Sequence, residues 1–220
     1  TSAGLQLLPL MLGLLITSVV SGRLITRTGR YKIFPILGSG TATVGLFMLS
    51  RCGVDTDIWF VWLSAFVLGT GLGGVMQVLV IAVQNNVEHK QLGAATSTTT
   101  FFRSIGGSFG TAVFGAVWTA QLATELSKNL PAEVAAQLNG AGQSAIASIG
   151  GISDLPGPIR DGVLLSFANS IDQTFLIAVP VMLVAFVLSF FLKEVPLKTK
   201  PSIEDELAHD AGVPVPETVD

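Results

Sequence analysis

Four stretches of this chain consist largely of apolar residues and contain no charged side chain. They are roughly Ala3–Gly22, Ile33–Leu49, Ile58–Val83 and Phe175–Leu192. A bilayer core about 30 Å thick is crossed by about 20 residues of α-helix. Three of the stretches meet or approach that length, and Ile33–Leu49 reaches its lower limit. The pattern therefore predicts an all-α membrane protein that crosses the bilayer several times.

Charged residues are scarce and lie outside these stretches. They make up 12% of the chain, against about a quarter in an average soluble domain. No basic stripe with interleaved aromatics is present, which excludes a nucleic-acid partner. The single cysteine, Cys52, excludes an internal disulfide and a CxxC metal site. We therefore predict no metal and no cofactor, and a lipid bilayer as the main surrounding.

The flanking charges predict the topology. Four basic residues and no acid occur within Arg23–Lys32, which marks a cytoplasmic loop by the positive-inside rule. A weaker fourth span, about 92–120, is needed if the basic residues after Leu192 are also to be cytoplasmic. The expected spans are residues 3–22, 33–49, 58–83, 92–120 and 175–192, with an external segment at 121–173 and a disordered cytoplasmic tail at 193–220.

The external segment is mixed in character. A short helix is expected after Pro131, and Ile159–Asp172 is expected to lead into the last span as an amphipathic helix on the lipid surface. A flexible connection without a specific role is the alternative. The chain begins at Thr1 without a basic region before its first apolar stretch. We expect a C-terminal part of a larger protein, with a processed small membrane protein as the alternative.

Glycines recur at four-residue spacing within two of the spans. Gly69 and Gly73 form one pair, and Gly106 and Gly110 form another. Small residues at this spacing allow two helix backbones to approach closely in lipid. A dinucleotide-binding loop is excluded for Gly69–Gly74, because no strand precedes these glycines. Both pairs are therefore predicted to be helix-packing positions.

The basic loop resembles the signature of the major facilitator superfamily, Gly-x-Leu-x-Asp-Arg-x-Gly-Arg-Arg/Lys. The matching residues are Gly22, Leu24, Arg27, Gly29, Arg30 and Lys32. Thr26 stands where the family has its aspartate. Two further segments, Gly4–Pro9 and Arg103–Gly110, resemble the drug:proton antiporters with fourteen transmembrane helices. By this resemblance, residues 1–192 form the C-terminal helical bundle of such a transporter, with five transmembrane helices present.

The resemblance implies proton-driven export of small amphipathic compounds from the bacterial cytoplasm across the cell membrane. It also implies a partner, the missing N-terminal half of the same transporter. The loop signature would then be a cytoplasmic gating loop, in which Arg27 and Arg30 bind carboxylates or helix-end carbonyls. The alternative is that these residues only fix topology and bind anionic lipid. Gly29 is expected to permit a tight backbone turn.

Arg103 and Gln77 are the candidates for the transport pathway. Arg103 is expected about 16 Å into its span, where a charge normally faces a cavity or a partner. The alternative places it at the cytoplasmic surface by snorkelling. No Asp or Glu occurs within the five expected spans, so the proton-coupling acid is expected in the missing half.

Two other classes of membrane protein are the alternatives to a transporter. A membrane-embedded enzyme requires a metal site, paired carboxylates or a nucleophile with its base within the spans, and the sequence has none of these there. We therefore predict that the chain is not an enzyme. A channel or a non-transporting assembly subunit would pair through the glycine positions, but nothing resembles a selectivity filter.

Overall fold

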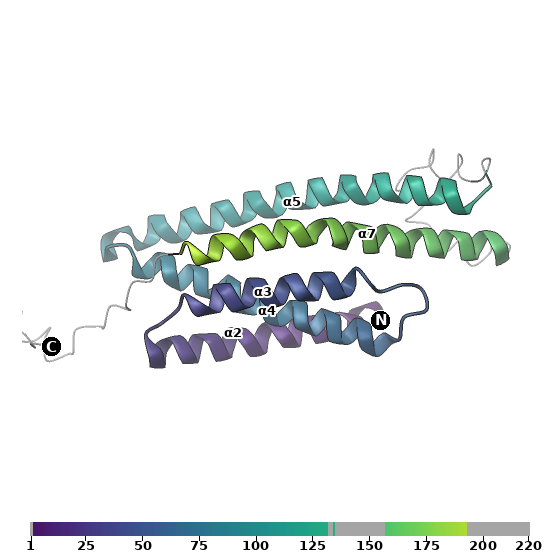
Figure 1. Cartoon of the computed structure of the whole chain (residues 1–220). Helices are drawn as coiled ribbons and strands as arrows, with labels where there is room; N and C mark the ends of the chain where they lie inside the picture. The colour runs from purple at the N-terminus through teal and green to yellow at the C-terminus, as the bar shows by residue number, and fades with distance from the viewer. Residues whose placement is uncertain (1, 132–133, 135–156, 193–220) are drawn as a thin grey trace, which may run out of the picture.

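The computed structural model describes residues 2–131, 134 and 157–192, and the regular elements in these ranges are all helical. Two short elements, α1 (Ser2–Gln6) and η1 (His89–Gln91), accompany the long helices. The long helices are α2 (Leu8–Thr28), α3 (Ile33–Leu49), α4 (Ile58–Asn85), α5 (Leu92–Asn129) and α7 (Gly157–Phe190). They run roughly side by side (Figure 1), which confirms the predicted all-α fold.

Three helical segments are long and apolar enough to cross a membrane. They are Gly4–Thr28, Ile58–Asn85 and Gly157–Phe190. The fourth apolar helix, α3, has 17 residues, as its sequence predicted. The remaining long helix, α5, has 38 residues but is more polar, with a run of threonines and Arg103 in its first half.

The structure corrects the predicted end of the first helix. The sequence placed this end at Gly22, but α2 continues to Thr28. The fall in hydropathy after Gly22 indicates that the helix leaves the apolar part of the bilayer, whereas the backbone continues to form helical hydrogen bonds. The hydroxyl groups of Thr26 and Thr28 donate hydrogen bonds to the backbone carbonyls of Arg23 and Leu24, at 2.9 and 2.7 Å. Most of the predicted basic loop is therefore helical.

Helices also occupy parts of the predicted external segment, 121–173. Its first part continues α5 to Asn129, and its last part, from Gly157, belongs to the same helix as the final span. The expected helical lead-in at Ile159–Asp172 is therefore continuous with that span, while its place on the lipid surface stays a prediction. The described part of the short helix expected after Pro131 is confined to Val134. Most of that helix and the tail, 193–220, lie outside the described residues.

The helices α2, α3 and α4 form one closely packed unit with α4 in contact with both of the others. Glycines on two sides of α4 make this possible. A Cβ added at Gly69 or Gly73 would collide with the backbone of Leu10 or Leu14 in α2. On the side of α3, an added Cβ at Gly71 would collide with the backbone of Ala42. The glycines of α4 therefore hold three helices together by backbone contact.

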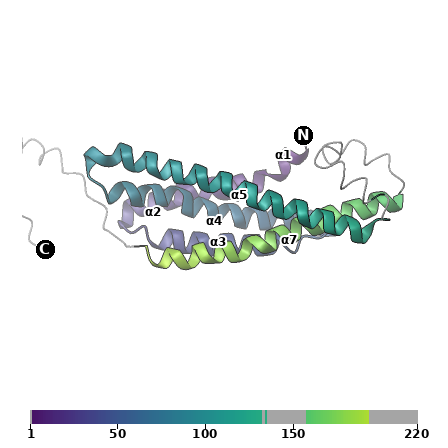
Figure 2. The ribbon, with the colours of Figure 1, turned by 90° about the horizontal axis from the view of Figure 1, so that it is seen from above.

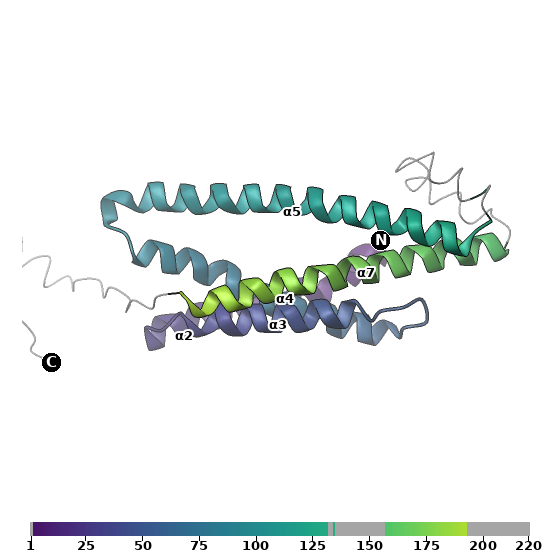
Figure 3. The same cartoon turned by 45° about the horizontal axis from the view of Figure 1, so that its top comes forward.

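The other two long helices pair with each other at one end of the molecule. Figure 3 shows α5 standing apart from the other helices along its first half and lying beside α7 along its second half. Seen from above in Figure 2, this α5–α7 pair extends beyond the three-helix unit. A small apolar core joins the pair, formed by Leu122, Leu126, Leu130 and Val163. Helix α7 also packs against α3 and so connects the two parts of the fold.

A buried carboxylate accompanies this core. Glu125 has an exposed fraction of 5% and accepts hydrogen bonds from Lys128 Nζ at 2.7 Å and Asn169 Nδ2 at 3.1 Å. Gln173 Nε2 lies 3.4 Å from the same carboxylate. The hydrogen bonds from Lys128 and Asn169 hold the pKa of Glu125 below its ordinary value. Glu125 lies beyond the predicted span 92–120, and it is paired and hydrogen-bonded, as a buried carboxylate requires.

Candidate functional site

The basic residues predicted to form a gating loop lie at one end of the molecule, which we call the basic end. Here α2 ends at a left-handed residue, Gly29, whose φ is 68°. The Gly29 N–H donates to the carbonyl of Ile25 at 2.9 Å. Among the described residues, Gly29 alone has a positive φ. An L-residue with a Cβ would be strained there, so the glycine provides the tight turn that the sequence predicted.

The cations of the signature are turned away from the described part of the chain. Arg27 and Arg30 are exposed, and Lys32 is half-buried. Within the described ranges, none of these side chains forms an ion pair, since the ion pair found there joins Lys128 and Glu125. Leu24, one turn before Arg27, is also exposed. An added Cβ at Gly22 would meet no atom within 4 Å.

A residue that sequence reasoning missed anchors this turn. Tyr31 is fully buried, with an exposed fraction of 0%. It packs with Ile25, Val78 and Ala82 in a core at the basic end. Its hydroxyl accepts a hydrogen bond from Asn86 Nδ2 at 3.3 Å, and Asn86 is the C-cap residue of α4. An aromatic residue between Arg30 and Lys32 reads as part of a solvated loop, so the sequence pattern gave no signal of its burial.

Gln77 of α4 and Arg103 of α5 are the candidates for the transport pathway. The Arg103 guanidinium donates from Nη2 to the backbone carbonyl of Met76 at 3.2 Å, next to Gln77. Both Arg103 and Gln77 are exposed within the described part of the chain. A second polar contact between α4 and α5, from Gln84 Nε2 to Thr96 Oγ1 at 3.1 Å, lies nearer the basic end. The structure therefore bonds Arg103 to the residue that precedes Gln77 in α4.

The two predicted glycine pairs differ in their surroundings. Gly69 and Gly73 lie where α4 touches α2, as described above. At Gly106 and Gly110, an added Cβ would meet no described atom within 4 Å. The packing role of this second pair stays a prediction, and its partner would have to come from outside the described residues.

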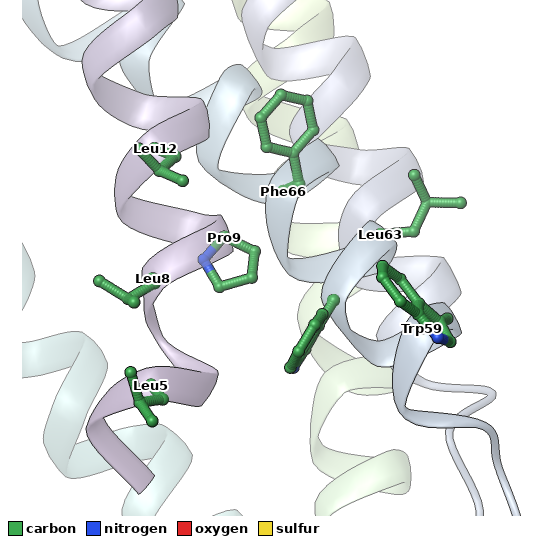
Figure 4. Close-up of a pocket in the computed structure, with 8 residues that line it drawn as sticks. Leu5, Leu8, Pro9, Leu12, Trp59, Leu63 and Phe66 are labelled. Atoms are coloured by element: carbon green, nitrogen blue, oxygen red, sulfur yellow. The ribbon is translucent and has the colours of Figure 1, made fainter. Parts of the chain in front are cut away.

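An apolar pocket of about 550 Å³ lies at the end opposite the basic turn. Figure 4 shows Leu5, Leu8, Pro9 and Leu12 on one side, and Trp59, Leu63 and Phe66 of α4 on the other. Trp59 is 74% exposed and meets Trp62 edge to face, with ring centroids 5.2 Å apart. The lining has no charged side chain, so it offers neither a proton site nor recognition of charge. Tryptophans at this position are typical of a membrane interface.

A metal site is not supported by the geometry. No group of three His, Cys, Asp or Glu side chains capable of holding a metal ion occurs in the part of the chain that the structure describes. What the site does present is a rigid turn with outward guanidinium groups and an arginine bonded to a helix carbonyl. Such an arrangement binds carboxylates and carbonyl groups.

Comparisons with known proteins agree with these features. An uncharacterised transporter of the major facilitator type from Mycobacterium tuberculosis strain H37Rv is 40% identical over 97% of the chain, which covers 30% of that protein. The tetracycline resistance determinant of Streptomyces rimosus is 31% identical over 96% of the chain, which covers 67% of it. The multidrug transporter protein MdtP of Bacillus subtilis is 28% identical over 94%, covering 42% of that protein.

The chain thus spans about a third of the length of its mycobacterial relatives. No solved structure matches it. The family model of the Major Facilitator Superfamily matches residues 1–111, a range that includes the glycine-packed helices, the basic turn and Arg103. With half of its length covered by that model, and with these transporters as relatives, the chain belongs to the major facilitator superfamily.

Proposed function

We propose that the full-length protein is a secondary transporter that exports small amphipathic compounds in exchange for protons. This chain would supply C-terminal helices of the transporter, and an N-terminal half would complete it. The observation that carries the proposal is the basic turn, where Arg27 and Arg30 project from a rigid helix end without an ion-pair partner among the described residues. The proposal includes no enzymatic activity, because the relatives are transporters.

The substrate class rests on relatives rather than on side chains of this chain. One relative is named a tetracycline resistance determinant and another a multidrug transporter protein. A third is named multidrug resistance protein 3 and comes from Bacillus subtilis. We propose the same kind of cargo for this protein, with the proton as the coupling ion.

In the proposed mechanism, Arg27 and Arg30 act at a gate on the cytoplasmic side. A guanidinium group presents five N–H donors and binds a carboxylate or the free carbonyls of a helix end through directional, charge-assisted hydrogen bonds. In one state of the transporter, these groups would bind the N-terminal half and close the cytoplasmic opening. In the other state they would be released into water.

Arg103 and Gln77 would line the pathway between the two halves. The exposure of both side chains supports this role. The Arg103 guanidinium bonds to the carbonyl of Met76, the residue before Gln77. An arginine and an amide at this depth offer hydrogen bonds to a polar group of a passing substrate or to an acid of the other half.

The proposed location is the bacterial cell membrane, with the basic end and the C-terminus in the cytoplasm. The basic residues of Arg23–Lys32 support this orientation through the positive-inside rule. The Trp59 and Trp62 side chains at the opposite end suit the outer interface.

Substitution at the basic turn tests the proposal. The full-length protein is produced in a drug-sensitive bacterium, and efflux of a fluorescent amphipathic dye is measured with and without a protonophore. We expect Arg27→Ala to lower the efflux rate at least tenfold with unchanged membrane insertion, because the loss of a charge-assisted contact costs about 1.5–3 kcal/mol. Arg23→Ala, an exposed cation outside the signature, is the matched control and should transport normally. The proposal would be contradicted if the protonophore left efflux unchanged, or if Arg27→Ala and Arg23→Ala had equal efflux rates.

A further inference from the structure

The basic turn is held by an inward-pointing side chain between its outward cations. Tyr31 has an exposed fraction of 0%, whereas Arg30 before it is exposed and Lys32 after it is half-buried. The chain between the end of α2 and the start of α3 comprises Gly29 to Lys32. In so short a connection, the direction of one side chain fixes the direction of its neighbours. The burial of Tyr31 therefore determines where Arg30 points.

Residues from several helices surround the Tyr31 ring. Ile25 comes from the last turn of α2, and Val78 and Ala82 come from α4. Phe34 of α3 and Leu192, just after α7, pack against the same cluster. The ring is thus the place where the turn meets the ends of the surrounding helices.

The hydroxyl of Tyr31 is hydrogen-bonded to another helix end. Its hydroxyl accepts from Asn86 Nδ2 at 3.3 Å, and the same amide nitrogen donates to the Ala82 carbonyl at 2.9 Å. The second bond fixes the orientation of the Asn86 amide at the end of α4. A buried tyrosine hydroxyl normally finds a partner, and here that partner belongs to a different helix end.

We propose that Tyr31 and Asn86 form a positioning pair that sets the orientation of the basic turn relative to α4. Helix α4 is locked by glycine contacts to α2 and α3, and Arg103 is bonded to it. The pair therefore links the gate residues to the helix that carries the candidate pathway. This role deepens the proposed function, since it rests on Arg27 and Arg30 acting at a gate.

The hydroxyl separates this role from simple packing. A phenylalanine at position 31 fills the same apolar seat and keeps the contacts with Ile25, Val78 and Ala82. A purely structural residue would tolerate this change. A positioning residue would not, because the bond to Asn86 is lost while the ring remains.

The test uses the full-length protein in a Cys52→Ser background, with Arg30→Cys as a reporter of the turn. The rate of labelling by a membrane-impermeant maleimide, added to inside-out membrane vesicles, is measured for Tyr31→Phe, for Asn86→Ala and for the double variant. We expect Tyr31→Phe to alter the labelling rate about fivefold, the effect of losing one hydrogen bond of ordinary strength, and Asn86→Ala, which also removes the bond to Ala82, to alter it at least as much. The double variant should show no more than the larger single effect, because both changes remove the same bond.

Ser21→Ala is the matched control. Ser21 is 1% exposed and lies in α2 near the turn, but its hydroxyl bonds to Ser18 of its own helix at 3.1 Å. It should leave the labelling rate unchanged. Unchanged labelling in Tyr31→Phe, additive effects in the double variant, or an equal effect of Ser21→Ala would each overturn the positioning role.

Transport is measured in parallel with Arg30 intact. We expect Tyr31→Phe and Asn86→Ala to lower the maximal efflux rate with an unchanged KM, because neither side chain contacts substrate. If labelling changes while efflux is normal in both these variants and Arg27→Ala, the pair positions the turn but the proposed gate fails. If Arg27→Ala abolishes efflux while Tyr31→Phe changes neither readout, the gate stands and the positioning role is refuted.

Discussion

The close contact between α2 and α4 predicts a large difference between two chemically identical substitutions. At Gly69, an added Cβ would lie 2.9 Å from the carbonyl carbon of Leu10 and 3.0 Å from its Cα, and closer still to the carbonyl oxygen. At Gly22, in the helix that Gly69 packs against, an added Cβ would meet nothing within 4 Å. Both glycines lie inside helices, so Gly69→Ala and Gly22→Ala form a matched pair.

The magnitude follows from two opposing effects. Replacing a helical glycine by alanine stabilises the helix by about 1 kcal/mol, and this gain is common to both positions. Overpacking costs about 1–3 kcal/mol. We expect the upper part of that range at Gly69, because the opposing atoms are backbone and have no alternative rotamer. The free energy of unfolding should therefore differ between the two variants by about 2–3 kcal/mol, with Gly69→Ala the less stable.

The assay is thermal unfolding of the two variants in detergent, followed by tryptophan fluorescence. A difference of 1 kcal/mol shifts the midpoint by about 2–4 °C in a chain of this size, so the midpoints should be about 4–12 °C apart. Gly73→Ala should behave like Gly69→Ala, since Leu14 opposes it in the same way. Equal midpoints at Gly69 and Gly22 would refute the inference that α4 and α2 are in backbone contact.

Two further predictions concern residues outside the predicted spans. Glu125→Gln should destabilise the pairing of α5 and α7 by about 1–3 kcal/mol and raise amide hydrogen exchange in residues 121–129. Because the pKa of Glu125 is lowered in the folded state, its contribution is fully present above the ordinary carboxyl pKa and is lost as pH falls through the folded value. The protection of these amides, measured relative to their intrinsic exchange rate at each pH, should therefore be constant from about pH 5 to 8, and a loss of protection within that range would contradict the lowered pKa. Burial, followed by the charge of Asp172, raises the pKa of the Cys52 thiol. Alkylation of Cys52 at neutral pH should therefore be slower than that of free cysteine, and the rate should recover in denaturant. Equal alkylation rates for Cys52 and free cysteine would contradict the half-buried position.

The helices could be predicted from the sequence more securely than their ends. Helix α3 begins at Ile33 and ends at Leu49, as the apolar stretch indicated. Hydropathy reports where lipid surrounds a helix, however, and a helix continues wherever its polar groups find partners. Helix α2 continues to Thr28 and α5 to Asn129, and polar side chains there, among them Thr28 and Glu125, find hydrogen-bond partners. A window of apolar residues contains no information on such contacts.

The site shows the same division between local pattern and tertiary contact. The glycine spacing at Gly69 and Gly73 and the turn at Gly29 depend on properties of single residues, and the sequence contained them. The burial of Tyr31 depends on Val78 and Asn86, which are 47 and 55 positions away in the chain. A contact between distant segments leaves no mark on a single sequence, so the anchor of the turn was missed although its cations were found.

The position of Arg103 has a consequence for the rest of the transporter. Met76, whose carbonyl accepts from Arg103, lies nine residues before the end of α4 at Asn85, which is about 14 Å along the helix axis. Helix α4 has 28 residues and is about 42 Å long, so that, if centred in a 30 Å core, it overhangs the core by about 6 Å at each end. The guanidinium bonded to Met76 would then lie about 8 Å inside the hydrocarbon boundary.

At such a depth, one hydrogen bond does not satisfy an arginine. The guanidinium has five N–H donors and a full charge, and a charge in the membrane interior costs at least about 2.5 kcal/mol unless it is paired or hydrated. The structure accounts for one donor, through the Met76 carbonyl, and leaves the side chain exposed on the open side of α5. The bond to Met76 directs one of these donors to α4. We expect the remaining donors to be satisfied by water in a pathway or by an acid on another helix, which the proposed N-terminal half would supply.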